Sequence, residues 1–194
     1  VEHYPEAKNK LVIIFNGVEE DVLQYRWKGQ RSDYVMYAGR IEKYKKLETA
    51  IDLTAELNRC GNLLKLLIIG QGSHLPKRKR YARNKATNKV EFTPPLSRKE
   101  YLKSIANAFT VINPSQHEAF SIFIAESLTI GTPAIVSPTI EKIYRNENTS
   151  EPPSPLSALS PIMHKLGLRI LAYHALEIKI WSEVAEKMLQ RIYP

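Results

Sequence analysis

The stretch FTVINPSQHEAFSIFIAESLTIGTPAIVS (residues 109–137) contains two short apolar runs joined by a segment of helical length. The runs FTVINP, residues 109–114, and PAIVS, residues 133–137, have the length and apolar side chains of buried strands. Between them, Ile122 to Ile130 predicts a helix that is apolar on most sides and ends at Gly131. Two strands joined by such a crossover helix form a βαβ unit, so they should lie parallel in one sheet.

The same alternation extends toward the N-terminus. Further strands are predicted in four apolar runs: Leu11 to Phe15, Tyr34 to Gly39, Leu63 to Gly70 and Lys89 to Phe92. Helices are predicted in three segments: Leu47 to Leu57, Leu75 to about Lys85, and a segment that runs from a capping box at Ser97 through Ala106. This order indicates an α/β fold, a Rossmann-like, doubly wound parallel sheet with helices on both faces.

The pattern changes after Pro138. Residues 146–161 are rich in proline and serine and predict an irregular, exposed loop, whereas about 176–192 predict an amphipathic C-terminal helix. A chain of 194 residues suits one domain. We therefore predict a single Rossmann-like domain over residues 1–194, with its core at about 11–137.

Composition excludes several kinds of protein. Cys60 is the only cysteine, which rules out a disulfide framework and fits a reducing compartment. No segment approaches the roughly 20 apolar residues of a membrane-spanning helix, and the first residues lack the apolar core of a signal peptide. The five histidines show no metal-ligand spacing. We expect a cytoplasmic protein that uses no metal or other cofactor.

The net charge of +8, from 28 Lys and Arg against 20 Asp and Glu, favours an anionic partner. Nucleic acid, phosphorylated metabolites and peripheral contact with an acidic membrane surface all satisfy this condition. The basic run Lys77–Arg80 predicts a solvated helix face, with a nucleic-acid patch as the alternative.

Ligands of doubly wound sheets bind outside the carboxyl ends of the strands, so the loops that follow the strands are the candidate site. In HEAFSIFIAE (residues 117–126), the amides of Phe120, Ser121 and Ile122 would open a helix and could bind an anion. Glu118 precedes this helix and Glu126 lies inside it, about 12 Å away if the whole segment were helical. The alternative is that Glu118 is a solvated residue of the loop and that Glu126 belongs to the polar side of the helix.

Two other loops carry suitable groups. Arg40 and Lys45 follow the strand that ends at Gly39, and an arginine fork with a lysine charge suits a diphosphate. Taken alone, this loop also fits an ordinary charged surface. Gly70 opens the loop GQGSH (residues 70–74), where the absence of a side chain would let backbone approach a ligand closely.

In their order along the chain, these features resemble a known family. Gly39-Arg40 with Lys45, LLIIGQG, PSQHEAFSIFIAE and GTPAIVS are similar to the C-terminal, nucleotide-sugar-binding domain of family 4 retaining glycosyltransferases with the GT-B fold, the glycosyl transferases group 1. The spacing of Glu118 and Glu126 matches that family's E-x7-E motif. Ala119 stands where the family usually has glycine, and so does Pro94.

The resemblance implies roles for these residues in binding a nucleotide-diphosphate sugar without a metal. Arg40 and Lys45 would neutralise the departing diphosphate, together with the amides of Phe120 to Ile122. Glu118 would bind the donor sugar, Glu126 the ribose, and Leu96 would flank the base. Gly39, Gly70 and Ala119 would also belong to the donor-binding residues.

The resemblance also implies a partner domain, because the family places its acceptor site on a separate N-terminal domain. We expect these 194 residues alone to bind the nucleotide but to transfer little sugar to a glycan or lipid acceptor. The rival hypotheses are a GT-B relative, such as a nucleotide-sugar epimerase or a phosphorylase-like enzyme, and a basic nucleic-acid-binding module. An isomer, a sugar phosphate, or salt-dependent oligonucleotide binding would identify them.

Overall fold

The computed structural model describes residues 16–61, 63–85, 89–144, 149–150 and 160–173. The strands are β1 Tyr34–Ala38, β2 Lys65–Ile69, β3 Val90–Thr93, β4 Thr110–Asn113, β5 Ala134–Val136, β6 Thr149–Ser150 and β7 Arg169–Tyr173. The α-helices are α1 Leu47–Arg59, α2 Leu75–Asn84, α3 Arg98–Asn107, α4 Ile122–Ile130, α5 Pro138–Tyr144 and α7 Ser160–Lys165. Within the described ranges there are three short 3-10 helices, η2 Glu20–Gln24, η3 Gly29–Arg31 and η4 Lys43–Lys45.

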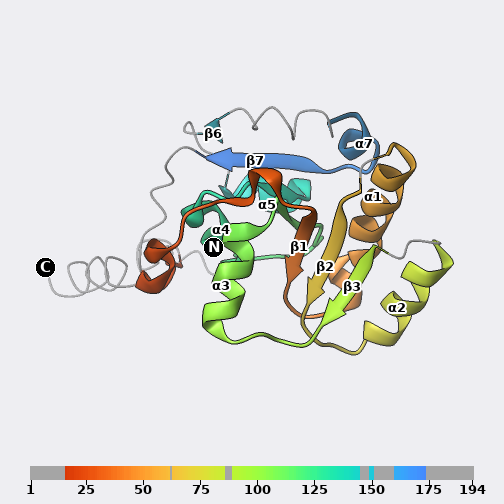
Figure 1. Ribbon diagram of the computed structural model, residues 1–194, viewed down its shortest axis with the longest axis horizontal. Helices are drawn as coiled ribbons and strands as arrows, with labels where there is room; N and C mark the ends of the chain where they lie inside the picture. The colour runs from red at the N-terminus through yellow and green to blue at the C-terminus, as the bar shows by residue number, and fades with distance from the viewer. Residues whose placement is uncertain (1–15, 62, 86–88, 145–148, 151–159, 174–194) are drawn as a thin grey trace, which may run out of the picture.

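The strands form one sheet in the order β3-β2-β1-β4-β5-β7-β6 (Figure 1). The first five strands in this order are parallel, as predicted. The chain moves from β1 outward to β2 and β3 and then returns to the other side of β1 with β4, so the order reverses between β1 and β4. A crevice at such a reversal is where ligands of doubly wound sheets bind.

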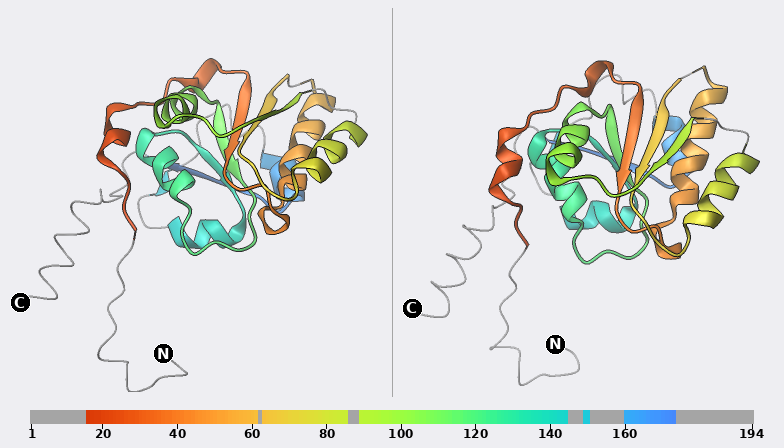
Figure 2. Two further views of the ribbon diagram at one scale, coloured as in Figure 1. Left: turned by 90° about the horizontal axis from the view of Figure 1, so that it is seen from below. Right: turned by 60° about the horizontal axis from the view of Figure 1, so that its bottom comes forward.

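Helices cover both faces of the sheet, which confirms the doubly wound prediction (Figure 2). On one face, Met36 and Val111 of the strands pack in a buried cluster with residues of α3, α4 and α5. On the other face, Tyr37 and Ile68 pack with residues of α1 and α7. Because successive side chains of a strand point to opposite faces, the apolar runs of β1, β2 and β4 supply both clusters.

Helix α4 lies in the middle of the first cluster. It is buried from Phe123 to Leu128, which explains why its sequence is apolar on most sides. The helix ends at Gly131, whose φ of 89° belongs to the left-handed region that favours glycine. Its one buried charge, Glu126, is therefore held deep within the fold.

The structure corrects the prediction for the C-terminal part of the chain. Pro138 begins helix α5, and β7 adds to β5 in the antiparallel direction, so the sheet is not parallel throughout. Residues 149–150 of the predicted loop form β6, which pairs with β7, and α7 begins at Ser160. The predicted strand Leu11–Phe15 and the predicted helix at about 176–192 lie outside the described residues.

The basic run on α2 is only partly solvated. Lys77, Lys79 and Arg80 are exposed, as expected for a solvated face. Arg78 is buried instead and forms an ion pair with Glu48 of α1 at 2.7 Å, so this side chain fastens α2 to α1. None of the described helices has the length and apolar character needed to cross a membrane.

Candidate functional site

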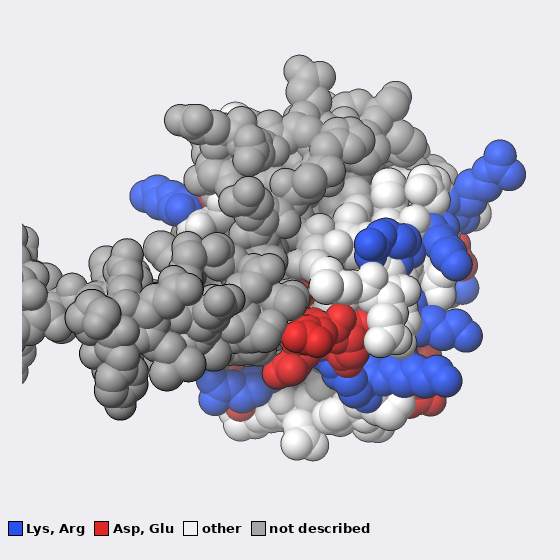
Figure 3. Space-filling view, turned by 90° about the vertical axis from the view of Figure 1, so that its left-hand side faces the viewer, with Lys and Arg blue, Asp and Glu red and all other residues white. Residues whose placement is uncertain are grey.

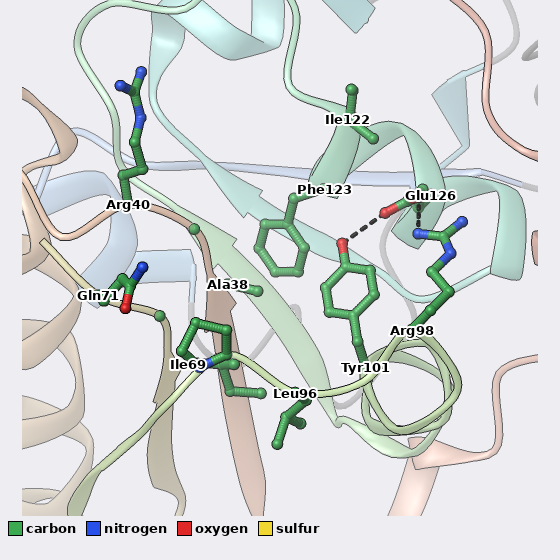
Figure 4. A pocket seen from close by; sticks show the side chains of 13 residues that line it. Ala38, Arg40, Ile69, Gln71, Leu96, Arg98, Tyr101, Ile122, Phe123 and Glu126 are labelled. Atoms are coloured by element: carbon green, nitrogen blue, oxygen red, sulfur yellow. Dashed lines mark hydrogen bonds and ion pairs between the residues drawn. The ribbon is translucent and has the colours of Figure 1, made fainter.

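A pocket of about 500 Å³ lies at the carboxyl edge of the sheet (Figure 4). Its lining comes from the segments that follow β1, β2 and β3, and from helices α3 and α4. Six of the predicted site residues line it: Gly39, Arg40, Gly70, Leu96, Ile122 and Glu126. Sequence analysis therefore identified much of the lining, from loops far apart in the chain.

The first wall of the pocket is made of two backbone segments in close contact. A Cβ atom placed on Gly70 would lie 2.0 Å from the carbonyl oxygen of Gly39, and one on Gly72 would lie 2.4 Å from that of Ile41. The Ile41 amide donates to the Gln71 carbonyl at 2.9 Å. The glycines of this loop are thus needed for packing against the segment after β1. Gly70 also lines the pocket, so its predicted close approach to a ligand remains a prediction.

The opposite wall contains the buried carboxylate of Glu126. This residue is only 2% exposed, yet its carboxylate lines the pocket. Its Oε2 accepts a hydrogen bond from the Tyr101 hydroxyl at 2.6 Å, and its Oε1 pairs with the Arg98 guanidinium. Burial and the neighbouring negative charge raise the pKa of Tyr101 well above its usual value, so the phenol stays protonated and can donate.

Arg98 connects two carboxylates. Its Nε and Nη2 donate to Asp21 of η2 at 3.0 and 2.8 Å, while Nη1 donates to Glu126. These contacts, with the Asp21 hydrogen bond as the largest cause, raise the pKa of Arg98 further. Figure 3 shows a group of acidic side chains, with Lys and Arg side chains beside it, on one face of the molecule.

Arg98 and Tyr101 were not among the predicted site residues, although both line the pocket. Both lie in the first turns of α3, where Ser97 and Glu100 form the predicted capping box. The position of Tyr101 in the sequence gives no indication that its hydroxyl pairs with Glu126. A buried glutamate in an apolar helix needs donors from a neighbouring element, and that requirement was the available signal.

The Asp21–Arg98 pair leads to a pH-dependent prediction. The hydrogen bond from Arg98 lowers the pKa of Asp21, so the pair stabilises the fold above the unfolded-state pKa of about 4 and loses this effect as the pH falls lower. We expect Asp21→Asn to lower stability by at most about 1 kcal/mol near neutral pH, because the pair is exposed.

Thermal unfolding of parent and Asp21→Asn at about pH 7 and about pH 3 would measure this effect. The gap in Tm should shrink at the lower pH. Glu19→Gln, a neighbouring exposed residue outside the ion pair, serves as the control. An equal gap at both pH values would contradict the assignment.

The structure separates Lys45 and Glu118 from the pocket lining. They form an ion pair with each other, and both side chains are largely buried. Glu118 Oε1 also lies 3.4 Å from Asn113 Nδ2, at the end of β4. The expected cationic pair is therefore divided: Arg40 lines the pocket, whereas Lys45 is bound to Glu118.

The segment before α4 also differs from the expectation. Residues 118–121 are not helical, so the spacing of about 12 Å assumed for a continuous helix does not apply. The amide of Ser121 donates to the Tyr144 hydroxyl at 3.2 Å, and its contact with a phosphate remains a prediction. Ala119 and Phe120 are not part of the pocket lining, whereas Ile122, at the first turn of α4, is.

In the described part of the chain, no three His, Cys, Asp or Glu side chains are grouped closely enough to hold a metal ion. The pocket instead offers the exposed guanidinium groups of Arg40 and Arg98, one buried carboxylate and an aliphatic surface that includes Ile69 and Leu96. These groups can bind an elongated ligand that carries an anion, hydroxyl groups and a flat apolar part.

Known proteins of related sequence match part of this chain. The family model described as glycosyl transferases group 1 matches residues 19–145. A GDP-mannose-dependent alpha-(1-6)-phosphatidylinositol dimannoside mannosyltransferase of Mycobacterium tuberculosis is 30% identical over 118 residues. This match covers 60% of the chain but only 30% of the mycobacterial protein.

Solved structures share the fold at low sequence identity. Sucrose-phosphate synthase from Thermosynechococcus elongatus gives a TM-score of 0.69 at 18% identity, with 98% of this chain and 55% of that one covered. The pneumococcal O-GlcNAc transferase GtfA, solved with UDP and GlcNAc, gives 0.68 at 15% identity, with 98% and 42% covered. These likenesses confirm the predicted GT-B type of fold. Because the family model matches well over half of the 194 residues, the chain belongs to the glycosyl transferases group 1 family.

Proposed function

We propose that this chain binds a nucleotide-diphosphate sugar as the donor half of a retaining glycosyltransferase, which moves a hexosyl group to a glycan or lipid acceptor. The observation that carries the proposal is the pocket at the strand-order reversal. It has the volume of a small-molecule site, with Arg40 on one side and the buried Glu126 carboxylate on the other (Figure 4).

The lining supports a place for each part of the nucleotide. The aliphatic surface at Pro95 and Leu96 suits the flat face of a base. Glu126 can accept hydrogen bonds from the vicinal hydroxyls of a ribose, because a carboxylate has about four acceptor positions. Arg40 is exposed at the pocket edge, where its guanidinium can bind diphosphate oxygens with two parallel hydrogen bonds.

The Lys45–Glu118 pair suits the sugar end of the donor. In transfer, the bond between the anomeric carbon and the diphosphate oxygen breaks, and the diphosphate departs with the electron pair. A positive charge fixed beforehand stabilises this leaving group better than one that must be recruited. The ion pair holds the Lys45 ammonium beside Glu118, whose carboxylate can accept hydrogen bonds from sugar hydroxyls.

The relatives give candidates for donor and acceptor. The mycobacterial relative uses GDP-mannose and a phosphatidylinositol dimannoside, and GtfA was solved with UDP and GlcNAc. We propose a guanine or uracil nucleotide sugar as donor and acceptor recognition by a second domain of the GT-B type. An acceptor carried by a lipid would place the protein at a membrane surface, where exposed cations such as Lys77 and Arg80 favour acidic headgroups.

Calorimetric titration with UDP, GDP and ADP, their sugars and the free nucleosides tests this proposal. The chain should bind one nucleoside diphosphate saturably. Arg40→Ala should weaken diphosphate binding by about tenfold and leave nucleoside binding unchanged, because it removes a charge-assisted hydrogen bond. Arg80→Ala, an exposed arginine on α2 away from the pocket lining, is the matched control. Failure of every nucleotide to bind, or equal binding by Arg40→Ala, would overturn the proposal.

A further inference from the structure

The burial of Glu126 needs a structural explanation. A carboxylate with 2% exposure is costly unless donors surround it. Helix α3 supplies both of the side-chain donors described above, the Tyr101 hydroxyl on Oε2 and the Arg98 guanidinium on Oε1. Each oxygen therefore has one fixed partner from a helix other than its own. The rotation of the carboxylate about its last bond is set by these two contacts.

Both donors are fixed in turn by other groups. The Arg98 guanidinium lies 5.8 Å from the centre of the Tyr101 ring and is held from behind by two hydrogen bonds to Asp21. The Tyr101 ring packs against Phe123, with centroids 6.4 Å apart. The capping box at Ser97 fixes the first turn of α3, from which both side chains project.

This arrangement leaves the pocket side of the carboxylate for a ligand. An ionised carboxylate has about four acceptor positions, and the two donors use two of them. Because so little of Glu126 reaches the surface, a ligand can approach it only from the pocket that it lines. Two neighbouring hydroxyl groups would be recognised only if both oxygens kept this orientation.

We infer that Tyr101 and Arg98 are positioning residues: they orient Glu126 so that it distinguishes a ribonucleotide from a 2′-deoxyribonucleotide. The inference rests on the proposed function, in which Glu126 meets the ribose. Neither residue needs to touch the nucleotide for this effect. Asp21 belongs to the same chain of contacts, because it holds the guanidinium that holds the carboxylate.

The test compares UDP with 2′-deoxy-UDP, and GDP and ADP with their 2′-deoxy forms, by calorimetric titration. The parent should bind the ribonucleotide about tenfold more tightly than the deoxy form, because one charge-assisted hydrogen bond is lost in the latter. Tyr101→Phe keeps the ring and removes only the hydroxyl. It should reduce the ribo-to-deoxy ratio by about three- to tenfold and leave the deoxy affinity within about twofold.

Two further variants complete the design. Arg98→Lys keeps the positive charge but loses the planar guanidinium that bridges two carboxylates. The ratio of its ribonucleotide affinity to its 2′-deoxyribonucleotide affinity should therefore fall as well. Tyr81→Phe removes another tyrosine hydroxyl bound to a carboxylate, Asp52 at 3.0 Å, in the cluster on the other face of the sheet. Its ratio should equal that of the parent. Circular dichroism would verify that each variant is folded.

The outcomes separate the two proposals. If a folded Tyr101→Phe keeps the parental ratio, or weakens ribo and deoxy forms equally, the positioning role is wrong. If the parent binds a nucleoside diphosphate without preferring the ribo form, this inference fails while the proposed function stands. If the parent binds none of the nucleotides, both fail.

Discussion

Glu126→Ala is expected to weaken nucleoside diphosphate binding by about a hundredfold, beyond the effect of any other single change in the pocket. The substitution removes the proposed ribose acceptor and leaves Arg98 and the Tyr101 hydroxyl without their shared partner. Loss of the buried side chain, which leaves the Tyr101 hydroxyl without its partner while Arg98 keeps Asp21, also costs about 2 kcal/mol of folding stability. Calorimetric titration and urea denaturation would measure the two effects.

Glu126→Gln separates binding from folding, because the amide keeps the size of the side chain and can still accept one hydrogen bond. It should lose less stability than the alanine variant but still bind weakly. Glu56→Ala is the matched control, since Glu56 is also a helical glutamate paired with an arginine, Arg59 at 2.6 Å, on α1 and outside the pocket lining. Parental affinity in both Glu126 variants would contradict the assigned role of this carboxylate.

Gly70→Ala is expected to have the largest effect on stability, a loss of about 3 kcal/mol or more. The added methyl group would lie 2.0 Å from the Gly39 carbonyl oxygen, and that atom belongs to backbone that is itself hydrogen-bonded to β2. The φ of 145° adds a conformational cost for any residue with a side chain. The free energy of unfolding from urea titration would show the loss.

Gly61→Ala provides the control for this substitution. Its φ of 83° is also positive, but no atom lies within 4 Å of the added methyl group. It should cost about 1 kcal/mol, the price of the backbone conformation alone. If Gly70→Ala were no more harmful than Gly61→Ala, the close contact between the two loops would not be as described.

The central strands and helices could be predicted because each has its own local signal. The run predicted as a strand from Leu63 to Gly70 contains β2, Lys65–Ile69, since a strand buried in a parallel sheet is a continuous apolar run closed by a turn residue. Helix α5 was missed although Ser137 before Pro138 is a helix-start signal, because the proline was interpreted as the end of the pattern. The antiparallel direction of β7 depends on the path of the chain after α5, which no local pattern encodes.

The loops that form the candidate site could be predicted, but the ion pairs between their side chains could not. Arg40 and Glu126 were found from their positions after strands and within a motif, and both line the pocket. That Lys45 would bind Glu118 could not be predicted, because residues 73 positions apart meet only in the folded chain. Arg98 was overlooked for a related reason. A charged residue in the first turn of a helix is normally solvated, and the buried carboxylate with which Arg98 pairs, Glu126, lies on another helix.

The backbone interlock between Gly39 and Gly70 bears on how the pocket adapts to its occupant. Two main-chain segments that touch without intervening side chains cannot slide past each other, so this wall acts as a stiff template. The exposed side chain of Arg40, by contrast, can change rotamer at little cost, whereas the exposed Ile122, which is β-branched and begins α4, has one preferred rotamer. Arg40 should therefore determine which donors bind according to their width, whereas the backbone wall at Gly39 and Gly70 keeps the depth of the pocket constant.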